Sequence, residues 1–203
     1  MEIKKPYNSF TWGLEPIQYE SIITATNIFN NGEIDRIIEA GKSGVHASVL
    51  TSANTSAEEG QSLRDCNVSF LYSDDPENTW LFAKLSELIN DANKNFYNYD
   101  LLNIESLQFT EYTAPGQRYG KHVDILSKSV NGQRKISFTV QLSDSDDYEG
   151  GDFIPHVSEE TMTASREKGA IHMFPSYMMH EITPVTRGVR YSLVGWVSGP
   201  AFK

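Results

Sequence analysis

The chain has 203 residues, of which 39% are hydrophobic and 11% aromatic, enough to form a packed core rather than a disordered segment. Its formal net charge of -10 argues against non-specific binding to nucleic acid and against docking on an anionic membrane, because both need a basic surface. Cys66 is the only cysteine, which excludes an intramolecular disulfide and a metal cluster held by several thiolates.

The first residues carry no apolar stretch typical of a signal peptide, and no apolar run approaches the roughly 20 residues of a membrane span. We therefore expect a cytoplasmic protein without membrane contact. The length and the lack of a visible linker predict one domain over residues 1–203. Within it we expect an annex of helices and strands over about 1–103 and a β core over about 104–199.

A short helix is predicted near the start of the chain, in NNGEIDRIIEAGKS, with Asn31 as its cap and Gly41 as its end. Its apolar positions follow helical spacing, at Ile34, Ile37 and Ile38. Residues 43–62 are rich in Ser, Thr, Ala and Gly and predict a mobile loop, with a short strand in VHASVL. NVSFLYS then alternates like a strand.

The clearest helix is predicted in DDPENTWLFAKLSELINDANKNFYNYD, with Asp74 or Asp75 as its cap and Pro76 in its first turn. One face of this helix is apolar at steps of three and four, through Leu81, Leu85, Leu88, Ala92 and Phe96. That face must cover apolar surface, and a sheet is the expected partner.

After Asp100 the sequence consists of short strand-like runs separated by turn residues such as Pro115-Gly116. About seven short strands at this spacing are typical of a sandwich or jelly roll. We therefore predict an α+β protein with a mainly β core, in which a double-stranded β-helix, or jelly-roll barrel, is flanked by N-terminal helices. Gly150 and Gly151 are expected at a tight corner or bulge.

The stretch YGKHVDI places His122 and Asp124 two positions apart, so that on a strand both side chains point to one face and could bind one ion. His180, at the start of a later run, is the candidate third ligand. Two histidines and one carboxylate form the facial arrangement of non-haem Fe(II) oxygenases. By itself the pair is a weak signal, because H-x-D occurs by chance in about a quarter of such chains and a solvated turn is the alternative.

Arg190 lies ten positions after His180, and TPVTRG between them is predicted to turn the chain back into an antiparallel partner strand that Arg190 begins. One face of that strand would carry Arg190, Ser192, Val194 and Trp196. An arginine that faces inward needs an anionic partner, and a dicarboxylate cosubstrate would supply one in bidentate geometry. The alternative is an exposed arginine at a strand start. We expect Arg187, in the turn, to face solvent.

Three segments in order give the chain a resemblance to a known family: FTEYTAPGQRYGKHVD, ISFTVQLSDSDDYEGGDF and KGAIHMFPSYMMHEITPVTRGVRYSLVGW. With them the sequence resembles the 2-oxoglutarate/Fe(II)-dependent dioxygenases, and among these the prolyl 4-hydroxylase-like branch. The matching features run from about Glu105 to Val197, nearly half of the chain, and are more specific together than any single motif.

The resemblance implies that His122, Asp124 and His180 bind iron, that Arg190 holds the far carboxylate of 2-oxoglutarate, and that the hydroxyl of Tyr112 contacts 2-oxoglutarate. The implied cofactor is Fe(II), with 2-oxoglutarate and O2 as cosubstrates and ascorbate in a supporting role.

The resemblance also places Tyr119 beside the iron and Trp196 at the border of the active site. We expect Tyr119, Trp196 and Arg64 to contact substrate. Without the resemblance, Tyr112 and Tyr119 read as barrel aromatics and Arg64 as part of a surface ion pair. The chain departs from some family members in having Val140 and Val194 where a tyrosine or threonine lines the cosubstrate pocket.

The implied activity is hydroxylation of a C–H bond, foremost in a prolyl residue of a peptide or protein, with succinate and CO2 as coproducts. A hydroxylase of a free amino acid or another small molecule, and a cupin-like binding barrel without activity, are the alternatives. The loop 43–62 is the candidate lid over a peptide. We expect His156 in solvent or at the substrate rim, and His172 hydrogen-bonded within its strand. The sequence makes no prediction of the oligomeric state.

Overall fold

The computed structural model describes residues 20–44, 46–50, 63–125, 132–157 and 162–202. Its strands form one 12-stranded antiparallel sheet, whose main path runs β1-β10-β7-β12-β5-β3-β6-β11-β9. The strands are β1 (Ile23–Ala25), β2 (His46–Leu50), β3 (Arg64–Leu71), β4 (Asn103–Ile104), β5 (Leu107–Thr113), β6 (Arg118–His122), β7 (Gln133–Gln141), β8 (Tyr148–Gly150), β9 (Phe153–Pro155), β10 (Ile171–Pro175), β11 (His180–Ile182) and β12 (Val185–Gly199).

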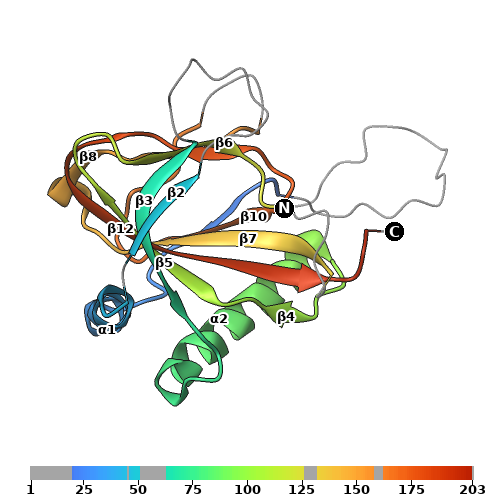
Figure 1. The fold of residues 1–203 in the computed structure, drawn as a ribbon. Coiled ribbons are helices and arrows are strands. Elements are labelled where there is room, and N and C mark those ends of the chain that lie inside the picture. Colours follow the sequence, from blue (N-terminus) through green and yellow to red (C-terminus); the bar gives the residue numbers. More distant parts are fainter. Residues whose placement is uncertain (1–19, 45, 51–62, 126–131, 158–161, 203) are drawn as a thin grey trace.

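The sheet curls on itself, so that inward-facing residues of β5, β7, β10 and β12 share one cavity with residues of β6, β9 and β11. Both helices lie on the outer side of this barrel (Figure 1). The predicted α+β architecture, a jelly-roll barrel flanked by N-terminal helices, is therefore confirmed. Within the described ranges, no helix is long and apolar enough to cross a membrane.

Helix α1 (Asn31–Lys42) begins one residue earlier than predicted, because the cap is Asn30 and not Asn31. The Asn30 side chain accepts a hydrogen bond from the Glu33 N–H, and the Glu33 carboxylate accepts one from the Asn30 N–H, which forms a capping box. The prediction that Gly41 ends the helix is wrong. Gly41 lies inside α1, where a Cβ atom would come within 2.2 Å of the Phe109 ring, so the glycine lets α1 lie directly on β5.

Helix α2 (Thr79–Ala92) follows a 3-10 turn, Pro76–Asn78, that Asp75 caps through a 3.0 Å hydrogen bond from the Glu77 N–H. A π-helical turn, Asn93–Tyr97, extends it. Its buried face differs in part from the predicted one, and consists of Leu81, Leu85, Ile89 and Ala92. The predicted Leu88 and Phe96 are only partly buried at the edge of this face.

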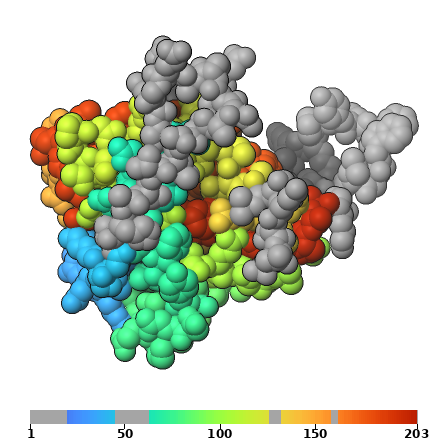
Figure 2. Space-filling model, in the orientation of Figure 1, coloured from blue at the N-terminus to red at the C-terminus, as the bar shows by residue number. Residues whose placement is uncertain are grey.

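The two helices lie side by side, below the strands in the space-filling view (Figure 2). Lys84 of α2 bonds both carboxylate oxygens of Glu33 in α1, at 2.7 and 2.8 Å. Apolar side chains from both helices bury the outer face of the sheet. A second apolar cluster, which includes Tyr112, Phe153 and Phe174, fills the barrel itself.

Strand alternation decides which side chains reach the barrel interior. On β12, Leu193 packs toward the helices while Ser192 and Trp196 line the cavity. On β7, Val140 belongs to the helix-side core and Thr139 lines the cavity. The prediction that Val140 lines the cosubstrate pocket is therefore wrong by one residue of register.

The prediction that TPVTRG folds β12 back onto β11 is also wrong. β11 pairs with β6 and β9, whereas β12 pairs with β4, β5, β7 and β8, so the chain crosses between the two halves of the barrel. β12 already begins at Val185, and Arg190 lies within the strand and not at its start. The expected short strand in VHASVL is β2; the rest of the expected loop and lid, residues 51–62, lies outside the described residues.

Candidate metal centre

Two histidines meet across a strand pair at one end of the barrel. His122 is the last residue of β6, His180 is the first residue of β11, and the two are register partners. Asp124 lies beyond the end of β6, so the prediction of two ligands on one strand is only half right. The backbone of this turn is held by the Ser176 carbonyl, which accepts hydrogen bonds from the Asp124 N–H at 2.9 Å and the Ile125 N–H at 3.0 Å.

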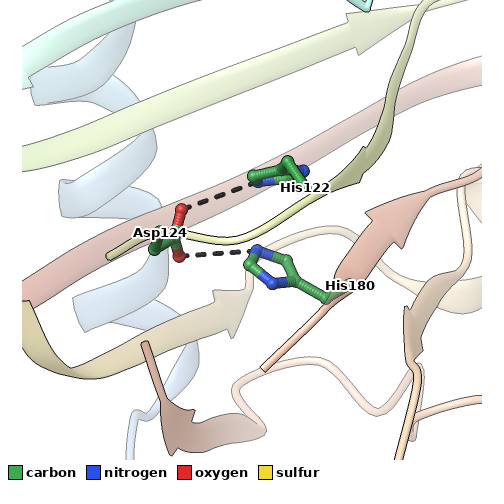
Figure 3. Close-up of side chains that lie close together, drawn as sticks. All are labelled: His122, Asp124 and His180. Atoms are coloured by element: carbon green, nitrogen blue, oxygen red, sulfur yellow. Dashed lines mark ion pairs between the residues drawn. The ribbon is translucent and has the colours of Figure 1, made fainter. Parts of the chain in front are cut away.

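The three side chains converge on one point (Figure 3). His122 Nε2 lies 3.6 Å from Asp124 Oδ1, and His180 Nε2 lies 3.4 Å from Asp124 Oδ2. One ligand atom from each of the three residues lies within 4.8 Å of the others. Two imidazole nitrogens and one carboxylate oxygen that could bind one face of the same ion are the donor set of a facial triad. This donor set suits a divalent transition metal.

Backbone carbonyls determine the tautomer of both histidines. His122 Nδ1 lies 2.8 Å from the Gly120 carbonyl oxygen, and His180 Nδ1 lies 2.9 Å from that of Met178. A carbonyl can only accept, so each Nδ1 carries the proton and donates. The lone pair of each ring is therefore on Nε2, the atom that faces Asp124, which prepares both rings to bind a metal.

Burial and the neighbouring His180 lower the pKa of His122 to about 4, against the opposing effect of Asp124. His122 is therefore neutral at pH 7 and available as a ligand. Aromatic rings hold both imidazoles in place: Tyr119 stacks on His122 with ring centroids 3.5 Å apart, and Phe174 lies against His180 at 4.8 Å.

The triad lines a cavity inside the barrel, together with Gln108, Tyr112, Tyr119, Phe153, Phe174, Ser192, Val194 and Trp196, among others. The structure thus brings the predicted Tyr112, Tyr119 and Trp196 to the same cavity as the triad. Burial raises the pKa of Tyr112 and of Tyr119, so both hydroxyls stay protonated at neutral pH.

Arg190 lines a second small cavity of the barrel, which shares Thr139 and Phe153 with the first. The residue is only 2% exposed. Its Nη1 donates to Ser192 Oγ at 3.3 Å, but its Nε has no hydrogen-bond partner, and among the described residues no carboxylate forms an ion pair with it. A buried guanidinium without an anion fits the carboxylate of a ligand in this barrel.

Arg64 lies inside the protein, so the alternative of a surface ion pair is wrong. Its Nε donates to Cys66 Sγ at 3.2 Å and its Nη2 to Gln108 Oε1 at 3.3 Å, while its guanidinium lies 5.3 Å from the Tyr119 ring centroid. Arg64 therefore contacts two residues that line the cavity, Gln108 and Tyr119.

The other candidates lie away from the triad. His172 is hydrogen-bonded as predicted, to Thr24 Oγ1 and to the Ser165 carbonyl, both at 2.9 Å. His156 pairs with Glu181 at 3.0 Å and is partly exposed. The side chain of Arg187 is exposed, as predicted, and pairs with Glu149.

Several residues at the site were not predicted, among them Gln108 and Ser176. Gln108 lines the cavity, and its place on the same strand face as Tyr112 could have indicated this. Ser176, whose carbonyl holds the Asp124 turn and whose hydroxyl accepts from Ser137 at 3.0 Å, carries no sequence signal of its role.

Residues 107–198 match the sequence model of the 2OG-Fe(II) oxygenase superfamily, and this segment contains the triad, Tyr112 and Arg190. The barrel, the triad and this match together make the matched segment similar to the oxygenase domains of that superfamily. Members of this family use Fe(II), 2-oxoglutarate and O2, and the triad is a donor set that fits such a metal.

The chain is similar to curated PKHD-type hydroxylases, with 42% identity over 86 residues to one from Synechococcus sp. (strain CC9605) and 32% over 124 residues to one from Synechococcus elongatus. These matches cover 42% and 58% of this chain, and span only 38% and 55% of the relatives' own length.

Solved structures share the fold. A prolyl-4-hydroxylase from Pseudomonas putida superposes with a TM-score of 0.66 at 17% identity, over 89% of this chain and 94% of that one. A prolyl hydroxylase from Trichoplax adhaerens was solved with a hypoxia inducible factor peptide fragment. It superposes with a TM-score of 0.69 at 18% identity, over 88% of this chain and 84% of that one. Together with the family match and the PKHD-type relatives, these shared folds confirm the predicted resemblance to the prolyl 4-hydroxylase-like branch.

Proposed function

We propose that the chain is a Fe(II)- and 2-oxoglutarate-dependent dioxygenase that hydroxylates a C–H bond, foremost in a prolyl residue of a peptide or protein, with succinate and CO2 as coproducts. The observation that carries this proposal is a facial triad in the same barrel as a buried Arg190 that forms no ion pair with a carboxylate among the described residues. A binding barrel without activity would need neither the buried Arg190 nor the two histidine Nε2 lone pairs that face Asp124.

In this proposal His122, Asp124 and His180 hold the iron, which together with 2-oxoglutarate and O2 supplies the oxidising power for an unactivated C–H bond. The histidines present Nε2 because Gly120 and Met178 hold their Nδ1 protons. Because His122 is neutral at pH 7, it does not have to lose a proton before the metal binds.

Arg190 binds the far carboxylate of 2-oxoglutarate, and the protonated Tyr112 hydroxyl donates a hydrogen bond to the same molecule. Both residues lie on paired strands and are register partners, so one rigid sheet sets their spacing. Phe153, Phe174 and Trp196 line the cavity with apolar surface and exclude water from the reacting atoms.

The substrate is a peptide by analogy: the related proteins carry hydroxylase names, and one solved neighbour holds a peptide fragment. Tyr119 and Trp196 form the cavity wall next to the triad and are the candidate substrate contacts. Trp196 Nε1 is buried, has no hydrogen-bond partner in the described part of the chain, and offers a donor to a substrate carbonyl. Arg64 contacts Tyr119. Ascorbate is the proposed supporting reductant.

The test is succinate formation with Fe(II) and 2-oxoglutarate, with and without a panel of proline-containing peptides. Stimulation by a peptide, with one added oxygen in its mass, supports a peptidyl prolyl hydroxylase. Stimulation only by free amino acids or other small molecules would assign a small-molecule hydroxylase instead. A protein that binds neither Fe(II) nor 2-oxoglutarate would be the cupin-like binding barrel.

A further inference from the structure

Tyr148, the first residue of β8, is buried and lines the same small cavity as Arg190. It is only 2% exposed, and its ring belongs to the apolar cluster inside the barrel. The hydrogen bonds around this hydroxyl determine where its own proton can go.

Gln141 donates to the Tyr148 oxygen. Its Nε2 lies 3.2 Å from the Ser143 carbonyl oxygen and 2.8 Å from Tyr148 Oη. Because a carbonyl can only accept, the atom between them must be the amide NH2 group, and its second proton points at Tyr148.

Arg166 also donates to the Tyr148 oxygen. Its Nε lies 3.2 Å from Tyr148 Oη, and its Nη2 is anchored on the Tyr148 and Gly150 carbonyls, both at 3.1 Å. A guanidinium can only donate. The Tyr148 oxygen thus accepts two hydrogen bonds, and its own proton needs a third partner. The part of the chain that the structure describes supplies no acceptor for that proton.

Tyr148 and Arg190 line the same small cavity and both approach Gly151 closely. A Cβ atom on Gly151, whose φ is +63°, would lie 3.0 Å from Arg190 Cδ and 3.4 Å from Tyr148 Cδ2. His172 lines the same cavity, but Thr24 and Ser165 already occupy both of its nitrogens. Two donors in this cavity are therefore left to a ligand, the Arg190 Nε–H and the Tyr148 O–H. A carboxylate accepts both.

We propose that Tyr148 recognises the far carboxylate of 2-oxoglutarate together with Arg190. This inference rests on the proposed function and adds a second donor beside Arg190 in the cosubstrate site. Gln141 and Arg166 are positioning residues, because they occupy the lone pairs of the Tyr148 oxygen and so direct its proton to the ligand.

The test compares two ligands on two variants. 2-Oxopentanoate has a methyl group in place of the far carboxylate of 2-oxoglutarate and keeps the keto acid end. Binding of each ligand to the Mn(II)-loaded protein is measured by calorimetry, for the wild type, for Tyr148→Phe and for Tyr191→Phe. Tyr191 follows Arg190 on β12, but stacks on Phe109 outside the barrel, and is the matched control.

We expect Tyr148→Phe to weaken 2-oxoglutarate binding by about tenfold or more, because a hydrogen bond to a charged group is lost, and to leave 2-oxopentanoate binding unchanged. Tyr191→Phe should alter neither. Equal losses for both ligands would assign Tyr148 a merely structural role, and unchanged 2-oxoglutarate binding would also overturn the inference.

If the wild type binds neither ligand, the proposed function fails, and this inference fails with it. If the wild type binds 2-oxoglutarate and Tyr148→Phe binds it equally well, only the inference fails. Should Tyr148→Phe not fold, a crystal structure of the wild type with 2-oxoglutarate decides. The Tyr148 oxygen is expected within about 3.0 Å of a far carboxylate oxygen, and a separation beyond hydrogen-bond reach contradicts the inference.

Discussion

His122 and His180 are register partners of the antiparallel strands β6 and β11, with ring centroids 4.1 Å apart. The strand pairing itself thus aims two imidazole lone pairs at one carboxylate, that of Asp124. A slip of one residue in this register would turn one histidine to the other face of the sheet and destroy the donor set. The sheet register places the two histidines, whereas the turn after β6, held by the Ser176 carbonyl, places Asp124.

Loss of one triad histidine should abolish metal binding. We expect His122→Ala to weaken Mn(II) or Fe(II) binding by more than about 100-fold, beyond the loss known for residues that only support a ligand, and to abolish succinate formation. His156→Ala is the matched control, because His156 pairs with Glu181 outside the triad. Calorimetric titration of both variants measures the effect, and equal metal affinities would refute the triad as the metal site.

The Arg190→Met substitution should raise the stability of the ligand-free protein and weaken the binding of 2-oxoglutarate. The buried charge of Arg190 costs free energy without an anion, so we expect the variant to raise the free energy of unfolding of the ligand-free protein by about 1 kcal/mol. The same change should weaken 2-oxoglutarate binding by about tenfold or more. Chemical denaturation and calorimetry measure the two effects.

The exposed Arg187→Met serves as the control for Arg190→Met, since it removes only a surface pair with Glu149 and should change stability by less than about 1 kcal/mol. A ligand-free Arg190→Met protein that is clearly less stable than the wild type would show that the charge has a partner within the protein.

Alanine substitutions at the two glycines of α1 should change the free energy of unfolding in opposite directions. A Cβ on Gly41 would come within 2.2 Å of the Phe109 ring, so we expect Gly41→Ala to lower the free energy of unfolding by about 1–3 kcal/mol. A Cβ on Gly32 would meet only Asn30 Oδ1, at 3.4 Å, so Gly32→Ala should raise it by about 0.5–1 kcal/mol. Urea denaturation measures both, and a neutral Gly41→Ala would contradict the close contact of α1 with β5.

The carboxylate of Glu33 should make the free energy of unfolding depend on pH. The hydrogen bond from Lys84 lowers the pKa of Glu33 from its ordinary value of 4.5, so the folded state favours the carboxylate. The stabilisation is therefore present above pH 4.5 and is lost as the pH falls through the lower folded pKa. Glu33→Gln keeps the backbone cap but loses the ion pair, so it should cost less than about 1 kcal/mol at pH 7.

That difference between wild type and Glu33→Gln should shrink toward zero on acidification. Thermal unfolding of both proteins at a series of pH values from neutral to acid measures it. A difference that stays constant across this range would show that the charge of Glu33 does not contribute.

The sequence by itself predicted two helices, the β class of the second half and a set of site residues, His122, Asp124, His180 and Arg190, because helical periodicity, turn residues and motif spacing are local signals. Only the tertiary structure decided which strands pair, that Thr139 and not Val140 faces the cavity, and that Gly41 is a contact with Phe109 rather than a helix end. These depend on register and close approach between segments far apart in the chain, which local preferences do not encode. The direction of the Tyr148 proton is such a case, since it depends on Gln141 and Arg166, two residues from separate segments.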